Sequence, residues 1–116
     1  MSTYPELLQQ IHGYMGKMGK GIPDTMRAFG QLHHSAVAPG ALTAKEKLLM
    51  ALGIAVAVRC KGCIAMHVHD ALKAGATEAE VLETLGIAVM MGGGPSVMYA
   101  TEAMQAMEQF REVGVK

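Results

Sequence analysis

The chain of 116 residues carries 10 basic and 10 acidic side chains, and 51% of its residues are hydrophobic. This length favours one domain, large enough to bury a core without disulfide staples. The zero net charge argues against nucleic-acid binding, because phosphate contacts need a cationic face. Disorder is excluded as well, because disordered chains combine low hydrophobicity with high net charge.

The first ten residues lack the basic patch and the apolar run of a signal peptide. The longest apolar stretch, residues 48–58, is well short of the roughly 20 residues that span a bilayer. We therefore expect a cytoplasmic protein with no membrane partner. In that compartment two cysteines are more often redox-active or metal-binding than a structural staple.

Helical signals follow one another along the chain, and strand patterns are nearly absent. Glycines weaken the second half of the first helix, and a proline opens the second. The sequence predicts an all-α domain over residues 1–116, with its core in 43–112. About six helices are expected, at 5–18, 23–35, 43–58, 59–74, 77–91 and 95–112.

Two capping boxes and one glycine mark helix ends. Thr43 with Glu46, and Thr77 with Glu80, have the spacing at which hydroxyl and carboxylate satisfy reciprocal backbone donors. Gly75 is suited to the left-handed conformation that ends a helix. These signals place the starts of the third and fifth helices and the end of the fourth.

The third helix is apolar on every face from Leu48 to Val58, which predicts burial within the protein or between subunits. The pentapeptide Leu-Gly-Ile-Ala-Val occurs at 52–56 and again at 85–89. We interpret the repeat as two similar core helices whose glycines permit close approach.

The chemistry-bearing residues lie in the fourth helix. Cys60, Cys63 and His67 fall within about 60° of one another on a helical wheel. His67 follows Cys63 by four residues, a spacing that brings side chains into contact, so it can accept the proton of the Cys63 sulfur. Asp70 shares this face and could orient His67, while His69 lies on the opposite face.

A reactive cysteine must ionise, and the sequence offers three aids to ionisation. The pair lies at a helix start, where the dipole stabilises an anion, and Arg59 and Lys61 flank it with positive charge. His67 can take the proton. A second thiol three residues away can trap an oxidised sulfur as a disulfide. Such a cycle needs neither a metal nor an organic cofactor.

Other interpretations of these residues stay open. A zinc site would use Cys60, Cys63 and His67 plus a ligand from elsewhere in the chain. Two inert core cysteines are a further alternative. The pair His33–His34 stands on a polar helical stretch, which is typical of a solvated surface.

The spacing Cys60-x-x-Cys63-x-x-x-His67, after an apolar helix, resembles the AhpD-like alkyl hydroperoxidase branch of the carboxymuconolactone decarboxylase family. The resemblance runs from about Thr43 to Glu112 and includes residues 71–80 and the turn at 92–95. It implies an all-α fold that assembles as homo-trimers or homo-hexamers.

The same resemblance implies thiol-dependent reduction of a small peroxide. Cys63, paired with His67, would be the peroxidatic thiol, and Cys60 the resolving thiol. Electrons would come from a dithiol partner, often a lipoyl-bearing protein.

One position departs from the family pattern. The peroxidase motif usually has a relay Glu twelve residues before the first Cys, and this chain has Leu48 there. Glu46 is explained by capping, which leaves Glu102 and Glu83 as candidate carboxylates. Decarboxylases of the family typically lack the Cys pair.

The leading hypothesis is therefore a cysteine-based peroxidase or disulfide reductase that acts through Cys60, Cys63 and His67. A second hypothesis is a non-enzymatic helical oligomer whose Cys pair binds metal or senses oxidants. A third is a lactone decarboxylase-like enzyme.

Overall fold

The structure is a computed structural model that describes residues 2–115. This part of the chain contains helices and no strand, which confirms the all-α prediction. None of these helices is long and apolar enough to cross a membrane. The helices are α1 (Tyr4–Gly21), α2 (Pro23–Val37), α3 (Ala44–Ala57), α4 (Lys61–Lys73), α5 (Glu78–Gly92) and α6 (Gly94–Val113).

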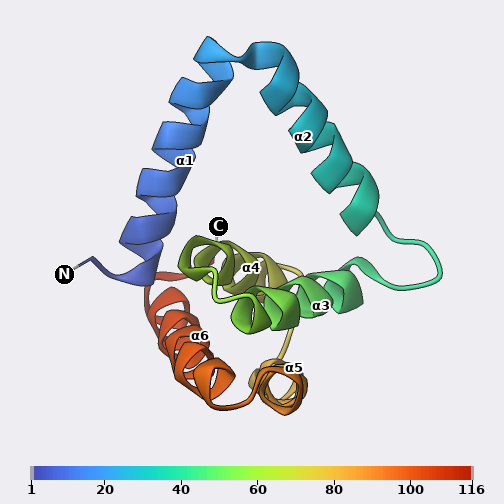
Figure 1. The fold of residues 1–116 in the computed structure, drawn as a ribbon, viewed down its shortest axis with the longest axis vertical. Helices are drawn as coiled ribbons and strands as arrows, with labels where there is room; N and C mark the ends of the chain where they lie inside the picture. The colour runs from blue at the N-terminus through green and yellow to red at the C-terminus, as the bar shows by residue number, and fades with distance from the viewer. Residues whose placement is uncertain (1, 116) are drawn as a thin grey trace.

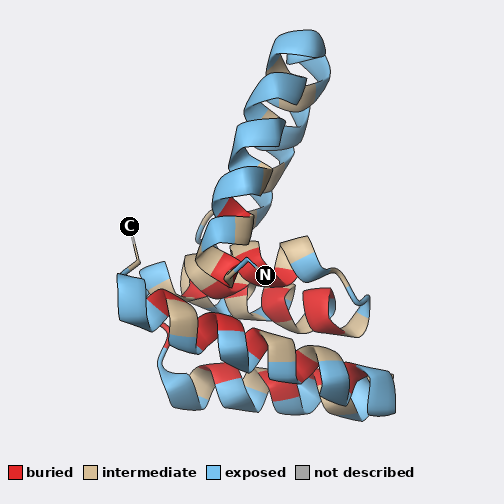
Figure 2. Ribbon diagram, turned by 90° about the vertical axis from the view of Figure 1, so that its left-hand side faces the viewer, coloured by how far each residue is buried: buried red, intermediate tan, exposed pale blue. Residues whose placement is uncertain are grey.

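Helices α3 to α6 form a packed body, in which α3 contacts α4 and α5 while α6 contacts the same two helices. Helices α1 and α2 form an inverted V above this body, which we call the α1–α2 arm (residues 4–37) (Figure 1). The arm is mostly exposed, and α2 has no buried residue (Figure 2). The start of α1 is anchored, because Tyr4 and Leu8 are buried in the core.

The predicted capping boxes are confirmed. The Thr43 hydroxyl accepts from the backbone N–H of Glu46 at 3.1 Å, and the Glu46 carboxylate accepts from the backbone N–H of Thr43 at 2.8 Å. Thr77 and Glu80 make the same pair of bonds. A third capping box, formed by Thr3 and Glu6, starts α1 at Tyr4, one residue before the predicted start.

The junction between α3 and α4 differs from the prediction of a fourth helix over 59–74. Arg59 adopts a left-handed conformation (φ 63°), and the chain leaves the helix there. The backbone N–H of Cys60 donates to Ala55, and that of Arg59 donates to Val56. These two bonds form a Schellman motif, which satisfies the last carbonyls of α3 and makes Cys60 the N-cap of α4.

Helix α4 ends with the same motif. The backbone N–H of Gly75 donates to Leu72, and that of Ala76 donates to Ala71. Gly75 has φ 93°, as the prediction of a glycine cap required. The arginine at the end of α3 therefore adopts a conformation that glycine takes at no steric cost.

The repeated pentapeptide lies on two packed helices, α3 and α5, as predicted. A Cβ at Gly53 would lie 3.4 Å from the Thr84 methyl group, so this glycine does permit close approach. A Cβ at Gly86 would meet nothing within 4 Å, and the same interpretation is wrong there. Gly86 is on the outer face of α5 and is exposed.

Helix α3 is only half buried in the single chain. Leu52 and Val56 are fully buried, whereas Ile54 and Val58 are each 64% exposed. The apolar sequence of this helix is therefore not explained by contacts within one chain.

The turn after α4 yields a stability prediction. Gly75→Ala should lower the free energy of unfolding by about 1–2 kcal/mol, because φ 93° is strained for any residue with a Cβ. Gly86→Ala is the control, since it adds the same methyl group in open space on a helix and should stabilise by up to about 1 kcal/mol. Urea unfolding of both variants measures the difference, and equal effects would contradict the assignment of strain to Gly75.

Candidate functional site

The two cysteines lie at the first turn of α4 and form a disulfide bond, with their Cα atoms 5.2 Å apart. Cys60 is the N-cap, and its Sγ accepts from the backbone N–H of Cys63 at 3.2 Å. Both residues are half-buried. The pairing that the sequence suggested as a product of oxidation is thus sterically available at this helix end.

Helix α1 covers the segment between the cysteines. A Cβ at Gly62 would lie 3.0 Å from Cδ1 of Ile11, so the glycine lets α1 approach the cysteine turn closely. The Lys61 ammonium lies 5.5 Å from the centroid of the Tyr4 ring. Helix α1 therefore packs against the turn that carries the disulfide, a contact that no local sequence signal indicated.

One predicted relay carboxylate has a different role. Glu102 on α6 accepts a hydrogen bond from the Tyr4 hydroxyl at 2.6 Å. Burial, together with this bond, raises the pKa of Tyr4 above its usual range. The bond ties α1 to α6. Glu83, the other candidate, is exposed on α5.

His67 lies on α4 and is half-buried against the end of α2. Its ring stacks on that of His33, with centroids 6.5 Å apart and planes 17° apart. The expectation of a solvated His33–His34 pair is wrong for His33, although His34 is exposed. The error arose because helical spacing within α2 gives no sign that this helix folds back toward α4.

Asp70 does not orient His67 through a hydrogen bond, contrary to the prediction. Its Oδ1 lies 2.8 Å from Nδ1 of His69, so this carboxylate oxygen is hydrogen-bonded to the imidazole of the adjacent residue. The His69 ring also packs edge-on against Phe110, with centroids 5.4 Å apart. Asp70 acts on His67 through its charge alone.

The pKa of His67 is lowered, chiefly because burial disfavours the charged imidazolium. His33 lowers it further, and the carboxylate of Asp70 opposes both effects. His67 is therefore neutral near pH 7, which is the state in which an imidazole accepts a proton.

A cavity of about 290 Å³ lies beside these histidines, between α2, α3 and α4. Leu48, which stands where the family pattern has a relay Glu, is one of its walls. Within residues 2–115, no three His, Cys, Asp or Glu side chains converge in a way that could hold a metal ion. The cavity is lined by His33, Val37, Leu48, Asp70, Lys73 and Ala74.

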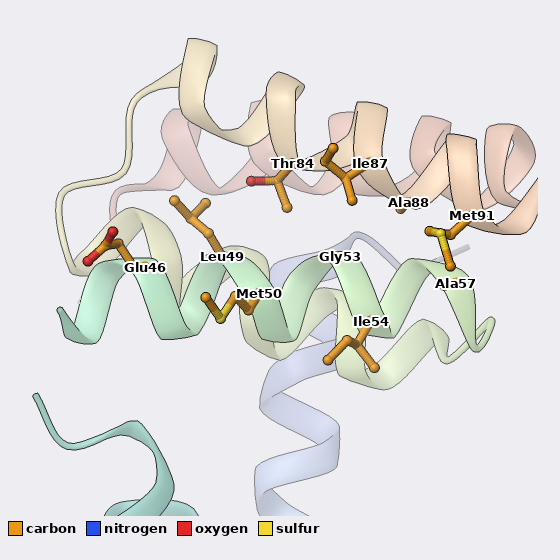
Figure 3. Close-up of a pocket in the computed structure, with 10 residues that line it drawn as sticks. All are labelled: Glu46, Leu49, Met50, Gly53, Ile54, Ala57, Thr84, Ile87, Ala88 and Met91. Carbon is orange, nitrogen blue, oxygen red and sulfur yellow. The ribbon is translucent and has the colours of Figure 1, made fainter. Parts of the chain in front are cut away.

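A second, larger cavity of about 630 Å³ forms an apolar groove between α3 and α5 (Figure 3). It is lined by side chains of α3 and α5, and none of its lining residues is a cysteine or a histidine. Its walls include Leu49, Met50 and Ile54 of α3, and Ile87, Ala88 and Met91 of α5.

Fold and site define an all-α protein with a Cys-x-x-Cys disulfide at a helix N-terminus. A profile of the carboxymuconolactone decarboxylase family matches residues 23–106. The chain belongs to this family. It is 37% identical over 97 residues to an uncharacterized protein of Cupriavidus necator, covering 84% of this chain and 86% of the relative.

Two solved structures of carboxymuconolactone decarboxylase family proteins support the same family assignment. The apo form of a carboxymuconolactone decarboxylase family protein from Legionella pneumophila is 45% identical, with a TM-score of 0.90, covering 92% of this chain and 96% of that one. A family protein from Thermotoga maritima, suggested to take part in an antioxidative response, is 31% identical. Its TM-score is 0.72, over 77% of this chain and 92% of that one.

The neutral state of His67 gives a pH prediction. As pH falls below the ordinary value of 6.5, His67 of the unfolded chain binds a proton while the folded protein resists it. The unfolded state then holds more protons, so stability decreases between about pH 7 and pH 5. The capping carboxylates Glu46 and Glu80, whose pKa values are lowered, titrate below this window.

Urea unfolding of the oxidised protein across this range measures the effect. His67→Gln should weaken the pH dependence, and His34→Gln, at an exposed position, should leave it as in wild type. If the stability of His67→Gln depended on pH as that of the wild type does, the pH dependence could not be assigned to His67.

Proposed function

We propose that this protein is a cysteine-based peroxidase of the AhpD-like type, which reduces a small hydroperoxide at Cys63. The observation that carries the proposal is the Cys60–Cys63 disulfide at the start of α4, with a neutral His67 on the same helix. The suggested antioxidative role of the Thermotoga maritima relative is in keeping with it.

The first step oxidises Cys63. His67 takes the thiol proton, and the thiolate attacks one oxygen of the peroxide O–O bond. An S–O bond forms, the O–O bond breaks, and the leaving alkoxide regains a proton from His67 to become an alcohol. Cys63 becomes a sulfenic acid, and the peroxide has gained two electrons.

The second step forms the disulfide. The Cys60 sulfur attacks Sγ of Cys63, the S–S bond forms, and the sulfenic oxygen leaves as water. In the disulfide the two Cα atoms lie 5.2 Å apart, within the range that is usual for disulfide bonds.

Three features favour the thiolate. The α4 N-terminus directs its dipole at both sulfurs. The backbone N–H of Cys63 donates to the Cys60 sulfur, and this bond favours the Cys60 thiolate that attacks in the second step. Arg59 and Lys61 add positive charge on either side of Cys60. His67 completes the set as proton acceptor.

The cycle closes when an external dithiol reduces the disulfide and is itself oxidised. We place this exchange in the cytoplasm, where dithiol reductants operate. Because α1 covers the cysteine turn, a slender dithiol such as a lipoyl arm fits the site better than a bulky protein surface does.

The same disulfide supports a second candidate function, an oxidant sensor that is oxidised without turnover. Multiple turnovers with a dithiol donor distinguish the peroxidase from the sensor.

Peroxide treatment of the reduced protein, followed by mass spectrometry, tests the chemistry. Wild type should lose two hydrogens faster than free cysteine reacts. Cys60→Ser should accumulate a sulfenic acid at Cys63, and Cys63→Ser should react slowly. Serine is a favoured N-cap residue, so Cys60→Ser preserves the start of α4. Reaction no faster than that of free cysteine, in wild type and Cys60→Ser alike, would overturn the proposal.

We also propose that copies of the chain associate as a trimer or hexamer. The groove between α3 and α5 exposes apolar side chains that lie together, and the α1–α2 arm exposes further large apolar side chains. Exposed apolar patches mark interaction surfaces. The exposed side chains include Tyr14, Met18, Ile22, Phe29 and Leu32 on the arm, and Met50, Ile54, Ile87, Met90 and Met91 on the body.

Light scattering after gel filtration tests the assembly. Wild type should have three or six times the mass of one chain. Ile54→Glu, which puts a charge into the apolar groove, should shift the protein toward the monomer. Gln105→Glu adds the same charge at an exposed polar position of α6 and should leave the mass unchanged. A monomeric wild type would refute the assembly.

A further inference from the structure

The stacked histidines leave two polar atoms without partners. His67 Nδ1 and His33 Nε2 are both buried, and neither has a hydrogen-bond partner among the described residues. Burying a polar atom without a hydrogen-bond partner is unfavourable, so each such atom calls for an explanation. These two atoms belong to neighbouring rings whose planes are nearly parallel, 17° apart, with centroids separated by 6.5 Å.

The position of His33 relative to Leu48 suggests that explanation. Both residues line the cavity of about 290 Å³ between α2, α3 and α4. Leu48 cannot relay a proton, but His33 brings a titratable group to the same cavity from α2. A neutral imidazole can both accept and donate a hydrogen bond.

We propose that His33 is the positioning residue that replaces the relay carboxylate, holding His67 and accepting a hydrogen bond from its imidazolium. This proposal rests on the peroxidase function proposed above. It adds to the catalytic machinery one residue of the α1–α2 arm, His33.

The proton path follows from this arrangement. His67 takes the proton of the Cys63 thiol, and its second nitrogen donates to a ring nitrogen of His33 through one bridging water molecule, because the two rings make no direct hydrogen bond. The proton remains on the pair until the alkoxide leaves and takes it back from His67. No electron moves in this relay, and the proton count returns to its starting value.

Other charged groups near the pair come from two helices. Asp70 and Lys73 of α4 line the cavity with His33, and Asp70 raises the pKa of His67. On α3 the wall is Leu48, while the ammonium of the neighbouring Lys47 donates to the carbonyl of Ala38 at 2.7 Å. Among the described residues that line this cavity, His33 is thus the one from outside α4 that can accept or donate a proton.

Alkylation of Cys63 by iodoacetamide, in the reduced Cys60→Ser protein, tests the relay without requiring peroxidase activity. At about pH 7, His33→Ala should slow alkylation roughly tenfold, because the imidazolium of His67 loses its acceptor. His34→Ala is the matched control, an exposed histidine one residue away, and should react as the parent does.

Rescue by a conservative variant separates a relay from a purely structural role. His33→Gln keeps a side chain that can accept a hydrogen bond, so it should restore most of the alkylation rate that His33→Ala loses at about pH 7.

Equal alkylation rates for His33→Ala and His34→Ala, or a rate for His33→Gln as slow as that for His33→Ala, would overturn the relay. His33→Gln retains a polar side chain of similar volume, so it decides the question even if His33→Ala disturbs α2. A wild-type protein that shows the relay in alkylation but does not reduce peroxide would refute the proposed function and leave the relay standing.

Discussion

The turn between α3 and α4 is the constraint on which the site depends. Arg59 leaves the helix in a left-handed conformation, and the Schellman bonds to Ala55 and Val56 fix the direction in which the chain continues. Cys60 becomes the N-cap of α4 as a result. Both sulfurs then lie at a positive helix end, where an anion is stabilised. A continuous helix through residue 59 would have satisfied those N–H groups internally and removed this advantage.

The α1–α2 arm completes the site from outside the body. Its first helix is tied to α6 by the bond between Tyr4 and Glu102 and covers the cysteine turn at Gly62. Its second helix returns to place His33 on His67. Both ends of the arm thus contact α4 side chains, while its tip projects from the body (Figure 2). Helices with so little burial in one chain gain little stability alone, which agrees with our proposal that other copies cover them.

The chemistry of the site rests on opposing effects at one imidazole. Burial and His33 keep His67 neutral, so it is ready to accept a proton, while Asp70 moderates the penalty of charging it. Leu48 contributes an apolar wall in place of a carboxylate. The result is an imidazole that is neutral near pH 7. In our proposal, His33 of α2 accepts a hydrogen bond from this ring once it has taken the thiol proton.

The sequence by itself determined the helical class, two capping boxes, the Gly75 turn and the pairing of Cys60 with Cys63, because each depends on residues within one turn of one another. It placed the start of α4 wrongly, since no local pattern predicts an arginine in a left-handed turn. It also misjudged His33 and Asp70. Contacts between α2 and α4, or between Tyr4 and Glu102 across 98 positions, follow from the packing of whole helices. Only the tertiary structure decided them, because helical periodicity gives the face on which a side chain lies but not the helix that will cover it.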